Sequence, residues 1–110
     1  MREDRERLQD MAEAIAQVER YAVRGKAEFL DNELIQTWVL FHLQVIGEAA
    51  RSLTEQTRSA YSEVEWRDII DFRNLLVHEY FRVDLELVWA IVAQELPILK
   101  DQVDRILANR

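Results

Sequence analysis

LIQTWVLFHLQVIGEAA (residues 34–50) is a strongly apolar stretch from which the architecture of the chain can be worked out. Its apolar residues recur three and four apart, the spacing of one side of a helix. They form two adjoining stripes, Leu34, Trp38, Phe41, Val45 and Ala49 beside Ile35, Val39, His42 and Ile46, with Leu40 and Leu43 widening the face. We expect a helix from about Asn32 to Leu53, capped by Asp31. Because so much of its circumference is apolar, this helix needs neighbours on several sides.

Gly47 lies near the end of this helix, where a glycine lowers helix stability by about 1 kcal/mol relative to alanine. Ala49 and Ala50 follow it, so the surface here is unusually small. We therefore expect another backbone to cross closely at Gly47, in the bundle or at a subunit interface.

Three further helices are indicated by the same reasoning. The first runs from about Arg2 to Arg24 and ends near Gly25, with an apolar stripe of Leu8, Met11, Ile15, Val18 and Ala22. The third begins at the capping box Ser62–Glu65 and frays near residues 78–81. The fourth is capped by Asp84 and bends at Pro97, because its stripe Leu85, Val88, Val92, Leu96, Leu99, Val103 and Ile106 keeps one phase across the proline.

Composition agrees with an all-helical protein. The 110 residues include two glycines and one proline, and strong helix formers are abundant. The length suits one domain, residues 1–110, and the spacing of the four helices favours an up-and-down four-helix bundle.

Charge and cysteine content limit the classes of function. The chain has no cysteine, which excludes disulfides and thiolate metal sites. Residues 1–7 are mixed in charge with no apolar run behind them, and no stretch is long enough to span a membrane, so we expect a cytoplasmic protein without a membrane partner. The net charge of −7 argues against general nucleic-acid binding, although residues 67–82 contain three arginines and three acids.

One segment, DFRNLLVHEYF (residues 71–81), interrupts an otherwise apolar helix with Arg73, Asn74, His78 and Tyr80. Asn74 and His78 are four apart and share a face, and Arg73 and Tyr80 are seven apart and nearly eclipse each other. Arg73 and His78 point about 140° apart on a regular helix. Either the last turn unwinds or a second subunit completes the site.

These residue types fit cleavage of RNA. The imidazole of His78 can move the 2′-hydroxyl proton or protonate the leaving oxygen. The guanidinium of Arg73 can stabilise the charge that develops on the phosphoryl oxygens. RNA supplies its own nucleophile, so this chemistry needs neither a cofactor nor a metal.

The chain resembles the HEPN ribonucleases, and among them the HepT toxins that pair with a minimal nucleotidyltransferase antitoxin. It matches their signature Arg-x-x-x-x-His-x-Tyr at Arg73, His78 and Tyr80. The similarity extends over IGEAA (46–50), WRDII (66–70), Arg73-Asn74, HEYF (78–81) and Val88-Trp89.

The resemblance implies a homodimer in which Arg73 and His78 of both subunits line one site for RNA, with tRNA as the expected substrate. Asn74 would support these groups, and Arg67 and Arg82 would contact the RNA. It also implies that the antitoxin transfers AMP to Tyr80, which adds negative charge and bulk beside the cleft and inhibits cleavage.

Structural roles stand beside these functional ones. Arg73 and Asn74 can form an interhelical salt bridge and a hydrogen bond, and Glu48 can pair with Arg51 or Arg67. His42 fits a core or interface position, and Trp38, Trp66 and Trp89 fall on apolar stripes that favour packing over base stacking. Two other functions remain open: a non-catalytic nucleotide- or RNA-binding module, and a helical adaptor of a nucleotidyltransferase complex.

Overall fold

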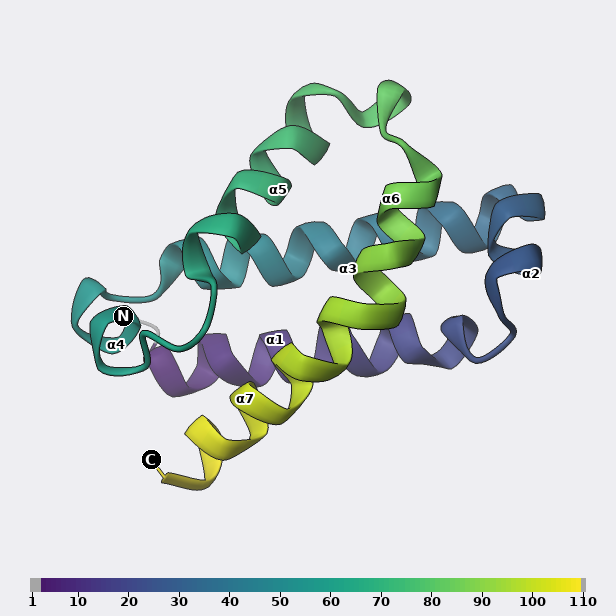
Figure 1. Ribbon diagram of the computed structural model, residues 1–110. Helices are drawn as coiled ribbons and strands as arrows, with labels where there is room; N and C mark the ends of the chain where they lie inside the picture. Colours follow the sequence, from purple (N-terminus) through teal and green to yellow (C-terminus); the bar gives the residue numbers. More distant parts are fainter. Residues whose placement is uncertain (1–2, 110) are drawn as a thin grey trace.

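The computed structural model describes residues 3–109, apart from the side chain of Phe81, and all regular structure among them is helical (Figure 1). The long helices are α1 (Asp4–Ala22), α3 (Glu33–Ser52), α5 (Trp66–His78) and the continuous run of α6 (Leu85–Ala90), the π-helical turn η2 (Ile91–Glu95) and α7 (Leu96–Asn109). Shorter elements are α2 (Lys26–Asp31), α4 (Glu55–Ala60) and the 3₁₀ turn η1 (Tyr80–Arg82). The expected all-α bundle of four long units is confirmed. The expected start of the first helix at Arg2 lies outside the described residues.

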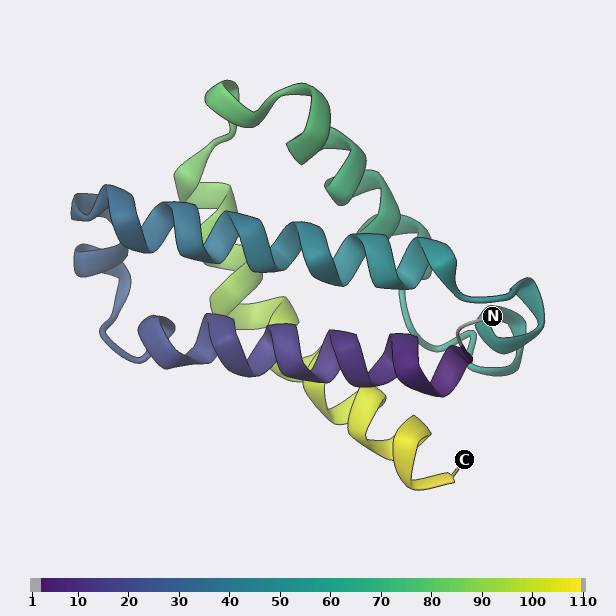
Figure 2. The same cartoon turned by 180° about the vertical axis from the view of Figure 1, so that it is seen from behind.

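The core lies where α1, α3 and the α6–α7 run meet. Helices α1 and α3 lie side by side in both views, and α7 crosses α1 (Figures 1 and 2). Buried side chains come from the predicted stripes: Leu8, Met11, Ile15 and Val18 of α1, Ile35, Val39, Leu43 and Ile46 of α3, and Val88, Val92, Leu96, Leu99, Val103 and Ile106 of the last run. The periodicity of the apolar residues therefore identified these core positions, whereas Leu34 and Phe41 of the other predicted stripe of α3 are 82% and 58% exposed.

The start of α3 differs from the prediction by one residue. The Oδ1 atom of Asn32 accepts hydrogen bonds from the backbone N–H groups of Leu34 (3.0 Å) and Ile35 (3.2 Å), so Asn32 is the N-cap. Asp31 instead ends α2, a short helix between the first two helices that the apolar periodicity indicated. This helix forms because it buries Phe29 in the core, and Gly25, with φ of 94°, allows the chain to turn into it.

The predicted capping box at Ser62–Glu65 is wrong. Helix α5 begins at Trp66, and its N-cap Glu65 forms no capping hydrogen bond through its side chain. Val64 and Trp66 are buried, and the indole N–H of Trp66 donates to the carbonyl of Tyr61 (3.0 Å). Burial of these two apolar side chains holds the segment in a turn, which overrides the local capping pattern.

The last helical run behaves as expected around its proline. Asp84 caps α6 by accepting hydrogen bonds from the N–H groups of Glu86 and Leu87. The run continues through Pro97 and changes direction near η2 (Figures 1 and 2). The wider π turn stands just before the proline, where the ring would otherwise collide with a carbonyl of the preceding turn.

Helix α5 crosses α3 at Gly47. A Cβ atom built on Gly47 would lie 2.2 Å from the Cβ and 3.3 Å from the Cα of Arg73. The crossing expected at this glycine is confirmed, and it brings in the helix that carries the candidate site. None of the described helices is both long and apolar enough to cross a membrane.

Candidate functional site

The side chain of Arg73 is held between α3 and α5. Its Nη2 atom lies 2.8 Å from Oε2 of Glu48, and its Nη1 donates to Oδ1 of Asn74 (3.0 Å). The side chain is 19% exposed, and its Nε is buried without a hydrogen-bond partner in the described part of the chain. Charge and packing therefore fix the guanidinium, with part of it reachable from solvent.

Glu48 is the residue whose role the sequence did not disclose. Its predicted pairing with Arg51 is present at 3.7 Å, whereas its shorter contact is with Arg73. The signal that could have found this pair was Gly47: whichever residue of α5 crosses the glycine also comes within reach of the adjacent Glu48. Since Arg73 is that residue, Glu48 becomes its counter-ion.

His78 is the last residue of α5, and its side chain is exposed. Because the helix stays regular from Arg73 to His78, the two side chains leave it about 140° apart. Unwinding between them, one of the two solutions expected, does not occur. Asn74 shares the face of His78, as predicted, and hydrogen bonds to Arg73.

Tyr80 does not continue the helix. The chain leaves α5 at Glu79, which has φ of −128° and ψ of 32°, and the backbone N–H of Glu79 donates to the carbonyl of Leu75 (2.7 Å). Tyr80 then opens the 3₁₀ turn η1 with a half-buried side chain. The expected eclipsing of Arg73 and Tyr80 is therefore wrong, because the fraying predicted for residues 78–81 removes the helix that would align them.

The two candidate RNA-contacting arginines lie on the surface. Arg67 lines an open pocket of about 720 Å³ together with Arg58 and Trp66. Arg82 is exposed at the end of η1. Within residues 3–109 neither arginine forms an ion pair, so both cations face solvent.

The aromatic residues of the first half pack rather than stack on a ligand. Trp38 donates its indole N–H to the carbonyl of Gln17 (2.7 Å), and its ring centroid lies 4.6 Å from that of His42. His42 is half-buried, and burial lowers its pKa, partly opposed by the negative charge of Glu13. The packing roles of the tryptophans are confirmed, since Trp66 is buried and Trp89 lies against Phe29. His42, expected at a core or interface position, is half-buried and does not belong to the core cluster.

No three His, Cys, Asp or Glu side chains in the described part of the chain are grouped so that they could hold a metal ion. The polar residues gathered near the end of α5 are instead a guanidinium, an amide, an imidazole and a phenol. We refer to Arg73, Asn74, His78 and Tyr80 as the polar cluster, a name for their place near the end of α5.

A family model described as Ribonuclease HepT-like matches residues 11–106. The chain therefore belongs to the HepT-like ribonuclease family. It is 31% identical over 106 residues to a protein of Thermococcus cleftensis named "Probable ribonuclease HepT", which covers 96% of both chains. It is 36% identical over 77 residues to a protein of Methanocaldococcus jannaschii named "Putative RNase", which covers 70% of this chain and 71% of the relative. A third relative, from Caldanaerobacter subterraneus and also named "Putative RNase", is 34% identical over 80 residues, 73% of this chain and 71% of the relative. No solved structure matches the chain.

Proposed function

We propose that this protein is a metal-independent endoribonuclease that cleaves RNA as a homodimer, with Arg73 and His78 as its catalytic residues. The observation that carries the proposal is that α5, in a chain of the HepT-like ribonuclease family, presents His78 to solvent and holds Arg73 in a fixed position. The 2′-oxygen of RNA attacks the adjacent phosphorus and the bond to the 5′-oxygen breaks, leaving a 2′,3′-cyclic phosphate and a 5′-hydroxyl. His78 moves the proton of the attacking or leaving oxygen, and Arg73 stabilises the charged phosphoryl oxygens.

The arrangement of α5 supports a site shared by two subunits. Within one chain, Arg73 points toward α3, where it pairs with Glu48, whereas the side chain of His78 leaves α5 on another side. A second subunit is therefore needed to bring an imidazole to each guanidinium. Helix α3 offers a surface for that subunit. Leu34 and Phe41 are 82% and 58% exposed, and with Glu48 they are spaced seven apart, along one face of the helix.

The resemblance to HepT toxins extends this proposal to substrate and control. We expect tRNA as the substrate, Arg67 and Arg82 as contacts to its phosphates, and a nucleotidyltransferase antitoxin as the partner. AMP transferred to Tyr80 would stand two residues from His78, where its charge and bulk repel RNA. The proteins reported above are named as ribonucleases, and their names mention neither AMP nor tRNA.

The test is incubation of the purified homodimer with tRNA in the presence of EDTA. We expect new RNA ends that carry a cyclic phosphate, and their loss in His78→Ala with the helical content and dimer unchanged. His42→Gln is the matched control, because it changes the other histidine of the chain and leaves the proposed site intact. Cleavage by His78→Ala at the parental rate would refute the mechanism.

The ion pair of Arg73 with Glu48 favours a second candidate, a non-catalytic helical adaptor of a nucleotidyltransferase complex. In that case Arg73 joins α5 to α3 and its low exposure serves stability alone. The adaptor predicts that the parental homodimer makes no new ends on tRNA, while Arg73→Ala still lowers the thermal midpoint. A non-catalytic binding module would retain tRNA in a gel-shift assay without cutting it.

A further inference from the structure

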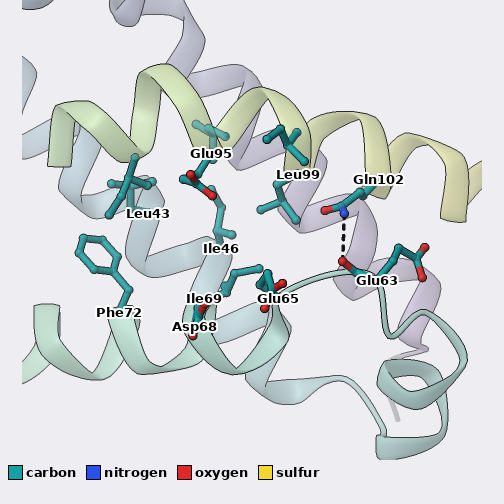
Figure 3. A pocket seen from close by; sticks show the side chains of 13 residues that line it. Leu43, Ile46, Glu63, Glu65, Asp68, Ile69, Phe72, Glu95, Leu99 and Gln102 are labelled. Carbon is teal, nitrogen blue, oxygen red and sulfur yellow. Dashed lines mark hydrogen bonds between the residues drawn. The ribbon is translucent and has the colours of Figure 1, made fainter. Parts of the chain in front are cut away.

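A groove between α5 and the α6–α7 run lies apart from the polar cluster described above. It encloses about 380 Å³, within the size range of ligand-binding pockets, about 300–1,000 Å³. Its floor and walls are apolar, formed by Leu43, Ile46, Ile69, Phe72, Ile91, Leu96, Ile98 and Leu99 (Figure 3). None of Arg73, Asn74, His78 or Tyr80 lines it, so the groove is not part of the proposed RNA site.

The groove lies between α5, which rests on α3, and the α6–α7 run. Contact at Gly47 holds α5 against α3, and Figure 3 shows α5 and the α6–α7 run on opposite sides of the groove. One end is closed where Nε2 of Gln102 donates to the carbonyl of Glu63 (3.2 Å), as Figure 3 shows. Ile98, at the side of the groove, is 56% exposed. Apolar surface therefore faces solvent in the space between α5 and the α6–α7 run.

The polar residues around this groove are negative. Its lining includes the carboxylates of Glu63, Glu65, Asp68 and Glu95, all on exposed residues, together with Gln102 and no lysine, arginine or histidine. Over the part of the chain that the structure describes, none of these four carboxylates forms an ion pair. They are uncompensated charges beside an apolar floor, which is the complement of a cationic amphipathic ligand.

We propose that this groove, named here the acidic groove, binds an amphipathic basic helix of a partner protein. Apolar side chains on one face of that helix would fill the space between Phe72 and Ile98, and flanking lysines or arginines would pair with the carboxylates. A second copy of this chain is the poorer occupant, because the four carboxylates of the groove require cationic partners and the face proposed for the second subunit lies on α3 instead. The proposal does not depend on RNA cleavage, and it stands if the proposed nuclease function fails.

The probe is a fluorescently labelled peptide of leucine and lysine, about four helical turns long, with its leucines on one face. The control is the same peptide with every lysine replaced by glutamate. Fluorescence anisotropy with the 110-residue protein should show saturable binding of the lysine peptide and none of the glutamate peptide. Equal binding of both peptides would overturn the role of charge.

Two pairs of variants separate the groove from the charge of the whole protein. The groove variant Glu65→Gln/Asp68→Asn/Glu95→Gln should weaken binding about tenfold, since it removes three potential ion pairs. Its control, Asp31→Asn/Glu33→Gln/Glu55→Gln, makes the same change in net charge at exposed residues outside the groove and should weaken binding less than about threefold. Equal losses from the two triple variants would show that the peptide responds only to net charge.

The apolar floor is tested by Ile98→Ser, an exposed position where the fold tolerates a smaller side chain. Binding should fall about fivefold, whereas Val23→Ser, an 81% exposed valine outside the groove, should leave it unchanged. Unchanged binding by Ile98→Ser contradicts the proposal. The proposal is also contradicted if the parent protein binds no peptide and Ile98→Ser sediments as a monomer where the parent sediments as a dimer. In that case a second copy of the chain covers the groove.

Discussion

Replacing Gly47 with alanine tests the crossing on which the position of Arg73 depends. Alanine is the better helix former by about 1 kcal/mol, so on an exposed helix the change would stabilise the protein. Here the new Cβ would lie 2.2 Å from the Cβ, 2.8 Å from the Cγ and 3.3 Å from the Cα of Arg73. Rotating the arginine side chain cannot move its Cβ or Cα away, so α5 itself must shift.

Overpacking of this kind costs about 1–3 kcal/mol, and the upper end applies because backbone must move. After the gain in helix propensity, we expect Gly47→Ala to lose about 2 kcal/mol of unfolding free energy, or about 8 °C in thermal midpoint. Cleavage of tRNA, measured well below that midpoint, should fall further than stability does, because a shift of about 1 Å in a catalytic group can cost about 100-fold in rate.

The assay is thermal and urea unfolding, followed by circular dichroism at one fixed protein concentration, since a dimer's midpoint depends on concentration. Arg73→Gly is the companion variant, because it removes the atoms nearest to the new methyl group. In a double-mutant cycle, Gly47→Ala should cost about 2 kcal/mol less when Arg73 is already glycine. A Gly47→Ala protein as stable as the parent, or additive free energies in the cycle, would refute the close crossing.

Three further outcomes are expected. Glu48→Gln should lower kcat for tRNA, because the guanidinium of Arg73 loses its counter-ion. The control Arg51→Gln removes the longer, exposed contact with Glu48 and should leave kcat unchanged. Equal losses of kcat in the two variants would contradict a positioning role for Glu48. Burial lowers the pKa of His42, so the unfolded chain binds a proton at this residue more tightly than the folded one, and the free energy of unfolding should fall as the pH drops below about 6.5. Urea unfolding at pH 7.5 and 5.0 should show that His42→Gln loses less unfolding free energy than the parent. An equal loss in both proteins would contradict the role of His42 in this pH dependence. Tyr80→Phe should cut tRNA at the parental rate and accept no AMP from a nucleotidyltransferase, as followed by mass spectrometry; AMP retained on the variant would show that another residue is modified.

Periodicity predicted the parts of the fold that depend on burial. The stripes of α1 and of the α6–α7 run form the core because their apolar side chains fall on one face of each helix and are buried away from water. Asp84 became a cap because a local hydrogen bond to the next turn needs no tertiary partner. At Ser62–Glu65 the same kind of local signal failed, since burying Val64 and Trp66 contributes more than a capping box.

The candidate site shows the same division. The sequence supplied Arg73 and His78 as candidates, and the helical angle between them left two alternatives, unwinding of the last turn or a second subunit; the regular helix in the structure removes the first. It could not supply the partner of Arg73, because that contact joins α3 to α5 and depends on which residue crosses Gly47. The acidic groove was equally invisible, since its lining comes from α3, α5 and the α6–α7 run together and not from any pattern along one of them.

Subunit mixing tests most directly whether one site is built from two chains. Arg73→Ala and His78→Ala homodimers should each be inactive on tRNA, and they are then unfolded together in urea and refolded as a mixture. The mixed dimer retains Arg73 on one subunit and His78 on the other, which is one of the two arginine–histidine pairs of the parental dimer. Because random pairing makes about half of the dimers mixed, the mixture should recover about a quarter of the parental rate. A mixture that stays as inactive as its two components, although mass spectrometry detects the mixed dimer, would contradict the shared site.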